Sequence, residues 1–123
     1  MQVLVTGGAG FIGSHSVDAL LASGASVRVL DDFSSGKRAN LRTHERLELV
    51  EGDIRDPKTV ARAMEGKTHV LHLAAQVFVP ASIEDPVHSA SINVTGYLNV
   101  LEAARRANVK RVVYASSAAV YGV

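Results

Sequence analysis

A glycine cluster directly after the first apolar run most constrains what this chain can fold into. The β-branched run Val3 to Val5 leads into that cluster, and a helix-patterned stretch begins at Phe11. The cluster fits both G-x-G-x-x-G and G-x-x-G-x-x-G through Gly7, Gly8, Gly10 and Gly13. So tight a turn needs positive φ, and without Cβ atoms a diphosphate reaches the backbone. The pattern therefore predicts a dinucleotide site at a helix N-terminus, with an ordinary strand-to-helix turn as the alternative.

Size and charge narrow the class of protein. The chain has 123 residues, which suits one domain. Its 13 basic and 12 acidic side chains nearly cancel, so bulk charge favours neither nucleic acid nor an anionic membrane. There is no cysteine, hence no disulfide, and no apolar run long enough to span a membrane. Because the first strand starts at residue 2 we expect no leader, and we predict a cytoplasmic protein.

Strand and helix patterns alternate along the chain, which is typical of a parallel sheet covered on both faces. We expect strands at 3–5, 26–30, 47–50, 70–73 and 111–115, and helices at 11–23, between Pro57 and Gly66, and from Pro86 to about Ala107. The first helix is expected to bury Ile12, Ser16, Ala19, Leu20 and Ser23. With right-handed crossovers, the fold class is α/β, a Rossmann-type doubly wound parallel sheet with five strands in the order 3-2-1-4-5.

An acidic residue stands where the second strand ends. Asp31 lies 24 positions after Gly7, close to the spacing of the acid that binds the adenosine ribose hydroxyls. Since a carboxylate repels a 2′-phosphate, it favours NAD over NADP, although Lys37 and Arg38 in the next loop keep NADP open. Asp53, after the third strand, is expected near the adenine. Loop-opening turn chemistry is the alternative for both acids.

Six successive stretches resemble the NAD-dependent epimerase/dehydratase family of extended short-chain dehydrogenases/reductases. They are Thr6 to Gly13, Asp31 to Gly36, Gly52 to Asp56, His72 to Gln76, Asn93 to Gly96 and Ser116 to Gly122. The resemblance covers the whole chain in order, and within the family it is greatest to the UDP-glucose 4-epimerase group. It implies a tightly held NAD that oxidises a nucleotide sugar at C4 and returns the hydride to the opposite face of a 4-keto intermediate.

The resemblance also implies roles for individual residues. The expected NAD-binding residues are Gly7, Gly10, Phe11, Ile12 and Gly13 at the diphosphate, Asp31, Ser35 and Gly36 at the adenine ribose, Asp53 and Ile54 at the adenine, and Leu73, Ala74 and Ala75 where the fourth strand ends. Ser117 is the expected catalytic serine, which would hydrogen-bond the reacting sugar hydroxyl. A serine that merely ends a strand is the alternative.

The family's general base is the tyrosine of a Tyr-x-x-x-Lys helix, and this chain contains no such motif. Tyr97 and Tyr114 lack the lysine, and Tyr121 lies too near the end. We therefore expect residues 1–123 to be an incomplete NAD-binding Rossmann domain, inactive alone, without the later strands and the nucleotide-sugar part. An unprotected fifth-strand edge or the helix 86–107 would then promote self-association.

Other functions remain open or fit poorly. The chain could act only as a non-catalytic dinucleotide-binding module, and a nucleotide-sugar dehydratase or an NADP-dependent reductase of the same superfamily is a further alternative. His69 and His72 lie three apart on a strand and face opposite sides, so no metal site is expected. Few aromatic residues accompany the basic ones, which argues against a nucleic-acid surface.

Overall fold

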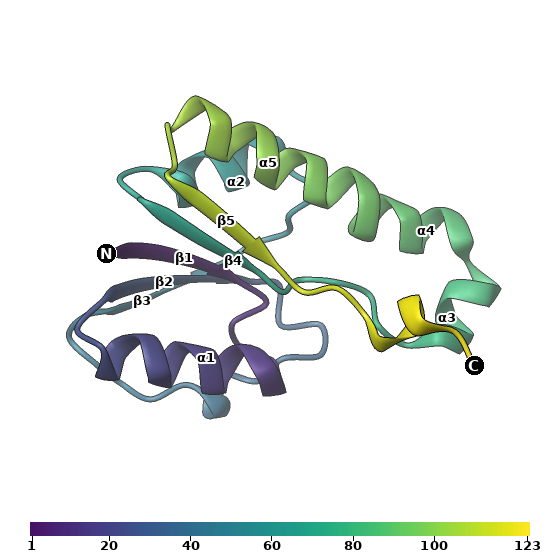
Figure 1. The fold of residues 1–123 in the computed structure, drawn as a ribbon, viewed down its shortest axis with the longest axis horizontal. Coiled ribbons are helices and arrows are strands. Elements are labelled where there is room, and N and C mark those ends of the chain that lie inside the picture. The colour runs from purple at the N-terminus through teal and green to yellow at the C-terminus, as the bar shows by residue number, and fades with distance from the viewer.

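The computed structural model describes residues 1–123 as a five-stranded sheet with helices on both faces (Figure 1). The strands are β1 (Gln2–Thr6), β2 (Ser26–Asp31), β3 (Leu47–Glu51), β4 (His69–His72) and β5 (Arg111–Tyr114). All pairs are parallel and the order is β3-β2-β1-β4-β5, as predicted. The carboxyl ends of β1 and β4 therefore meet at one edge of the sheet.

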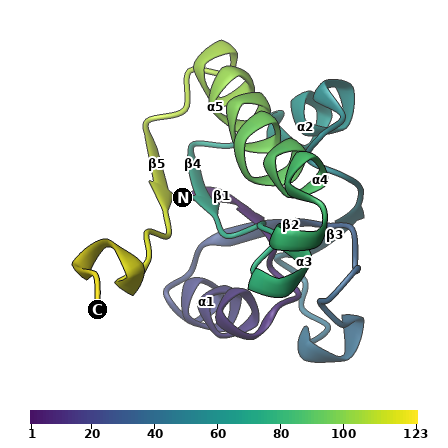
Figure 2. The same ribbon diagram turned by 90° about the vertical axis from the view of Figure 1, so that its right-hand side faces the viewer.

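The helices divide between the two faces of the sheet (Figure 2). Helix α1 (Phe11–Ala22) covers one face, and α2 (Pro57–Met64) and α5 (Tyr97–Arg106) cover the other. Asp56 caps α2, because its side chain accepts a hydrogen bond from the Lys58 N–H. The sequence patterns did not predict α3 (Val79–Glu84) or the 3₁₀ turns Arg38–Asn40 and Ala118–Tyr121.

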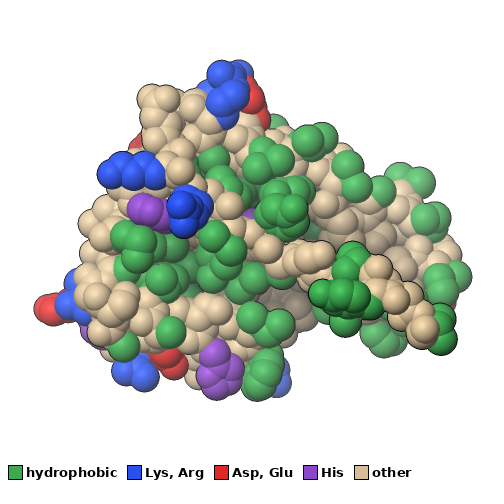
Figure 3. Space-filling view, viewed as in Figure 1, with side chains coloured by type: hydrophobic (Ala, Val, Ile, Leu, Met, Phe, Trp, Pro, Cys, Tyr) green, Lys and Arg blue, Asp and Glu red, His purple; other side chains and the backbone are tan.

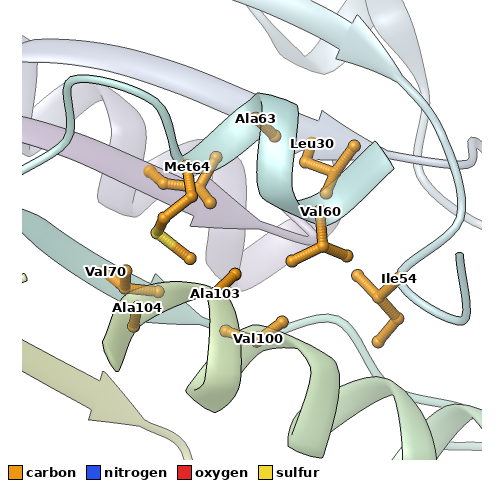
Figure 4. Packing of buried hydrophobic residues seen from close by; sticks show 10 residues of the cluster. Leu30, Ile54, Val60, Ala63, Met64, Val70, Val100, Ala103 and Ala104 are labelled. Carbon is orange, nitrogen blue, oxygen red and sulfur yellow. The ribbon is translucent and has the colours of Figure 1, made fainter. Parts of the chain in front are cut away.

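Alternating strand residues feed two hydrophobic cores. Leu30 and Val70 pack with Val60, Met64 and Val100 of α2 and α5 in one cluster (Figure 4). Leu4 of β1 belongs to the same cluster. The residues on the opposite face form the second cluster against α1: Val3, Val5, Val17, Leu21, Ala25, Val27 and Val29. Each fully buried valine or leucine contributes about 1.5–3 kcal/mol, so these clusters hold β1 and β2 at the centre of the molecule.

The buried face predicted for α1 was wrong. Gly13, Val17 and Leu21 form it together with Ser14, whereas Ile12 is 65% exposed. Ser16 is only half-buried, and its hydroxyl donates to the Ile12 carbonyl, so its polarity needs no compensation inside the core. The prediction chose the wrong face because it counted Ile12 as a core residue, whereas Ile12 lies in the first turn of the helix and is exposed.

One long helical segment runs from α4 (Pro86–Ala90) through a π-helical turn (Ser91–Gly96) into α5. Its start at Pro86 and its end near Ala107 agree with the prediction. Figure 3 shows hydrophobic side chains exposed along this side of the molecule. Val94 and Leu98, both in this helical segment, are more than half exposed. No helix is both long enough and apolar enough to cross a membrane.

Candidate functional site

The glycine turn joins β1 to α1 under tight steric limits. Gly7 has φ +70°, and a Cβ there would lie 2.7 Å from the Ala74 nitrogen at the end of β4. A Cβ on Gly13 would lie 2.2 Å from the Gly7 carbonyl oxygen, so the first turn of α1 must be bare to pack on the turn. Both glycines are therefore required by packing, in agreement with the prediction of a strand, a tight turn and a helix.

The N-terminus of α1 presents free donors at this turn. The first backbone hydrogen bond of the helix runs from Ser14 N–H to the Gly10 carbonyl at 2.9 Å, and the N–H groups of residues 11–13 have no partner. A Cβ on Gly10 would approach only the Gly7 oxygen, at 3.4 Å, so the space beside Gly10 is otherwise open. With Phe11 and Ile12 both exposed, an anion can reach these donors.

Asp31 is buried at the carboxyl end of β2 and contacts the glycine turn directly. One carboxylate oxygen accepts the Ala9 N–H at 2.9 Å, and the other accepts the Phe33 N–H at 2.8 Å. An ionised carboxylate has about four acceptor positions, so two remain for hydroxyl donors. The structure thus brings together the acid and the glycine turn that the sequence predicted separately.

The loop after β2 packs on the same turn. Gly36 is buried against Ala9, and a Cβ on Gly36 would lie 2.8 Å from the Ala9 carbonyl carbon. Ser35, which precedes it, is exposed. The Ala9 carbonyl oxygen accepts from the Lys37 N–H at 3.1 Å and from the Asn40 side-chain amide at 2.8 Å.

A buried hydroxyl connects β1 to the end of β4. Thr6 Oγ1 accepts from the N–H groups of Leu73 and Ala74, both at 3.2 Å, and lies 2.7 Å from His72 Nδ1. Since the hydroxyl already accepts two hydrogen bonds, its own hydrogen donates to Nδ1, and the His72 ring is neutral with its hydrogen on Nε2. Burial lowers the pKa of His72 to about 4, which agrees with that neutral form.

A cleft of about 210 Å³ opens beyond this point, between the ends of β4 and β5. Its lining residues are His72, Leu73, Ala74, Ala75, Asn93, Tyr97, Tyr114 and Ala115. The Tyr97 ring stacks on the His72 ring with centroids 4.8 Å apart, and its centroid lies 5.5 Å from that of the Tyr114 ring. Desolvation and the nearby Tyr114 raise the pKa of Tyr97, so its phenol stays protonated at neutral pH.

Asp53 and Ile54 follow β3 and have different surroundings. The Asp53 carboxylate holds Arg55 through three hydrogen bonds of 2.6–3.1 Å, and Arg55 lowers the pKa of Asp53. Arg55 also reaches His88 at 3.4 Å and Ser91 at 3.5 Å on the long helix. The Ile54 side chain is buried in the core beside Gly96. Its carbonyl oxygen accepts from the Asn99 side chain at 2.9 Å, so the backbone N–H is the group left for an adenine.

Ser117 does not line the cleft. It is exposed three residues past the end of β5, where its hydroxyl accepts the Ala119 N–H at 3.1 Å and caps a 3₁₀ turn. No group of three or more histidine, aspartate or glutamate side chains is arranged to hold a metal ion.

Sequence reasoning missed two asparagines that shape the site. Asn93 bridges both backbone groups of Gln76, accepting its N–H at 2.8 Å and donating to its carbonyl at 3.1 Å, and it lines the cleft. Asn40 holds Ala9 from 31 residues away. The family resemblance includes Asn93 in one of its stretches but assigned it no role in the site. No local pattern marked Asn40.

The sequence matches the NAD dependent epimerase/dehydratase family over residues 3–123. A curated relative, UDP-glucose 4-epimerase of Mycolicibacterium smegmatis, is 48% identical over 127 residues, which cover 99% of this chain and 41% of the relative. The chain thus spans about two fifths of the length of that relative.

Solved structures agree in fold. The UDP-glucose 4-epimerase of Thermus thermophilus in complex with NAD superposes with a TM-score of 0.88 at 49% identity, over 95% of this chain and 38% of that one. UDP-N-acetylglucosamine 4-epimerase from Methanobrevibacter ruminantium, solved with UDP-N-acetylmuramic acid, gives 0.91 at 41% identity, over 98% and 39%. The matched family, the shared strand order and the glycine turn lead to one conclusion: this chain belongs to the NAD dependent epimerase/dehydratase family.

Proposed function

We propose that residues 1–123 form an NAD-binding domain that provides the cofactor-binding part of a nucleotide-sugar epimerase. The observation that carries the proposal is the 2.9 Å hydrogen bond between Asp31 and the Ala9 N–H. It makes the acid and the glycine turn one unit at the carboxyl ends of the strands, where ligands of open α/β sheets bind. The NAD complex of the Thermus thermophilus relative supports the choice of cofactor.

The chain's own residues fit the parts of NAD. The free N–H groups of Phe11 and Ile12 would bind the diphosphate beside Gly10, and Asp31 would accept the adenosine ribose hydroxyls between Ser35 and Gly36. At the adenine end of the cofactor, Asp53 and the Ile54 backbone would contact the adenine. At the nicotinamide end, the contacts would come from three residues that line the cleft: Leu73, Ala74 and Ala75.

Charge around Asp31 favours NAD over NADP. The carboxylate repels a 2′-phosphate, and the arginine in the loop after β2 already has other partners. The Arg38 guanidinium lies 4.2 Å from the centroid of the Phe33 ring and pairs with Glu51 at 3.3 Å. Lys37 forms no ion pair, so it is the remaining cation that a 2′-phosphate would meet.

The substrate we propose is a UDP-sugar, epimerised at C4 as in UDP-glucose and UDP-galactose interconversion. NAD would supply a hydride acceptor that later returns the hydride. Ser117, whose exposed hydroxyl only accepts a hydrogen bond in this structure and lies outside the cleft, would donate its hydrogen to the reacting hydroxyl. The Methanobrevibacter relative is named for UDP-N-acetylglucosamine, so an N-acetylated sugar belongs to the same class.

A second candidate is a non-catalytic dinucleotide-binding module. It rests on the same glycine turn and Asp31, which would hold a dinucleotide with or without a catalytic base. A nucleotide-sugar dehydratase or an NADP-dependent reductase is a third. The non-catalytic module and the dehydratase predict the same NAD binding as the epimerase, whereas the reductase predicts binding of NADP.

Calorimetric titration of the purified chain with NAD and with NADP tests the proposal. Wild type should bind NAD more tightly than NADP, and Asp31→Ala or Asp31→Asn should weaken NAD at least about tenfold, because charge-assisted hydrogen bonds are lost. Asp32→Ala is the matched control, since the Asp32 carboxylate is exposed and bonds only Ser34. A wild-type chain that binds no NAD would refute the proposal.

A further inference from the structure

Ala9, at the tip of the glycine turn, is held from both ends of its backbone. It is fully buried, its N–H donates to Asp31, and its carbonyl oxygen accepts two hydrogen bonds from the loop after β2. One comes from the Lys37 backbone at 3.1 Å and the other from the Asn40 side chain at 2.8 Å. The turn is therefore clamped between the end of β2 and a loop about thirty residues away in sequence.

Asn40 is the only residue whose side chain donates a hydrogen bond to this turn. The Ala9 carbonyl belongs to the same peptide group as the Gly10 N–H, and Gly10 is the N-cap residue of α1. Fixing that peptide fixes the direction in which the free N–H groups of Phe11 and Ile12 point. The loop that carries Asn40 is itself anchored, because Leu41 packs on the α1 core and Arg42 pairs with Asp18 of α1 at 3.0 Å.

We propose that Asn40 is a positioning residue for the diphosphate-binding turn. The inference rests on the proposed function that the chain binds NAD. A carboxamide suits the position because it donates to the Ala9 oxygen without bringing a charge. An aspartate of the same shape has no N–H to donate at neutral pH, and its negative charge would face the carbonyl oxygen. Asn40 touches neither sugar nor nicotinamide in this role and acts only through Ala9.

The test compares Asn40→Asp and Asn40→Ala with wild type, and uses Thr43→Ala as control. Thr43 lies in the same loop, is exposed, and its side chain makes no hydrogen bond. Without NAD, the ¹³C shift of the Ala9 carbonyl and the ¹⁵N shift of the Gly10 amide should move in both Asn40 variants and stay fixed in Thr43→Ala. Because the Lys37 N–H still bonds Ala9, both variants should keep the wild-type fold elsewhere in the spectrum.

Calorimetry with NAD then measures the consequence for binding. Asn40→Ala should weaken NAD by about tenfold, the equivalent of one hydrogen bond, and Asn40→Asp should weaken it more. Unchanged Ala9 and Gly10 shifts would overturn the inference whether or not wild type binds NAD. Moved shifts with wild-type affinity in both variants would overturn it as well. A wild-type chain without affinity for NAD would instead refute the proposed function, while the shifts alone would still decide whether Asn40 positions the turn.

Discussion

The buried hydroxyl of Thr6 fixes the hydrogen bonds at the end of β4, where the cleft begins. Thr6 Oγ1 satisfies two N–H groups at the end of β4 and the Nδ1 atom of His72. No fully buried side-chain nitrogen or oxygen in the structure lacks a partner, and that holds for the buried atoms of this network. A network of this kind is costly to disturb, because any group left alone would be buried without water.

Protonation of His72 disturbs that network, which gives a pH prediction. The pKa of the folded ring is about 4, against 6.5 in an unfolded chain. Between these values the unfolded chain binds more protons than the folded one, so stability present above pH 6.5 is lost as the pH falls toward 4. The loss should reach about 2–3 kcal/mol, measured by urea denaturation across this range.

The matched variant for this prediction is His72→Asn. Its side-chain oxygen takes the place of Nδ1 and accepts from Thr6, but it does not titrate. This variant should lose much less stability than wild type between pH 6.5 and 4. The same pH dependence in both proteins would mean that another group is responsible. The ion-paired Glu102 is a poor candidate, because Arg105 and Arg106 lower its pKa to about 2.

The position of a site residue was predictable from the sequence where a local motif or spacing marked that residue. The place of Asp31 at the end of β2 was predictable from the sequence pattern, whereas its role at the ribose is untested. Its bond to Ala9 and the bond from Asn40 were not predictable, because both depend on how the loop after β2 folds back on the turn. That the named residues contact NAD, and that Ser117 is catalytic, remain predictions.

At the scale of elements, the strand, turn and helix at the N-terminus behave as one packed unit. Gly7 fits against the end of β4, and Gly13 fits against Gly7. Gly10 differs from both, because its φ of −75° is accessible to any residue and the space beside it is open. Packing therefore accounts for Gly7 and Gly13 but not for Gly10, which we propose is bare so that the diphosphate can approach.

Substituting two of these glycines separates the roles. Gly13→Ala should lower the free energy of unfolding by about 3 kcal/mol, because its Cβ would lie 2.2 Å from a backbone oxygen. Gly10→Ala should stay within about 1 kcal/mol of wild type and yet bind NAD at least about tenfold more weakly, since its Cβ occupies the diphosphate approach. Denaturation and calorimetry on the same samples measure both. Undiminished NAD binding by Gly10→Ala would contradict the assignment.

The regular elements were predicted well and the irregular ones poorly. Strand boundaries agree to within one or two residues, because alternation and flanking glycines mark them. Helix α3 was missed, since Val79–Glu84 contains a proline and buries no residue, so it has no apolar periodicity. The 3₁₀ turn at Arg38–Asn40 was missed for the same reason, because it too buries no residue.

At the scale of the whole molecule, the two faces of the sheet are covered unequally. Helices α2 and α5 lie over one face, while α1 packs on β1 and β2 and leaves the same side of β5 open (Figure 2). Val113 on that side is 50% exposed, and β5 pairs only with β4. An open parallel edge with apolar side chains is a ready site for association.

We propose that the chain self-associates through this edge or through the long helix, where Val94, Leu98 and Leu101 follow one another at helical spacing. Sedimentation velocity over a concentration series should show a species larger than the monomer. Leu98→Glu should abolish it if the helix forms the contact, and Val113→Lys if the edge does. Ala61→Glu, on the exposed face of α2, should change nothing. A wild-type monomer at every concentration would refute the proposal.

The tyrosine rings at the cleft also give the chain an intrinsic fluorescence that a bound cofactor would change. The chain has three tyrosines and no tryptophan, so tyrosines alone give its intrinsic fluorescence. Two of the three, Tyr97 and Tyr114, line the cleft where the nicotinamide half of the cofactor is proposed to lie. Reduced nicotinamide absorbs where tyrosine emits, and oxidised nicotinamide does not. A chain that binds as proposed would therefore report the oxidation state of its cofactor through the quenching of its own emission, without a label.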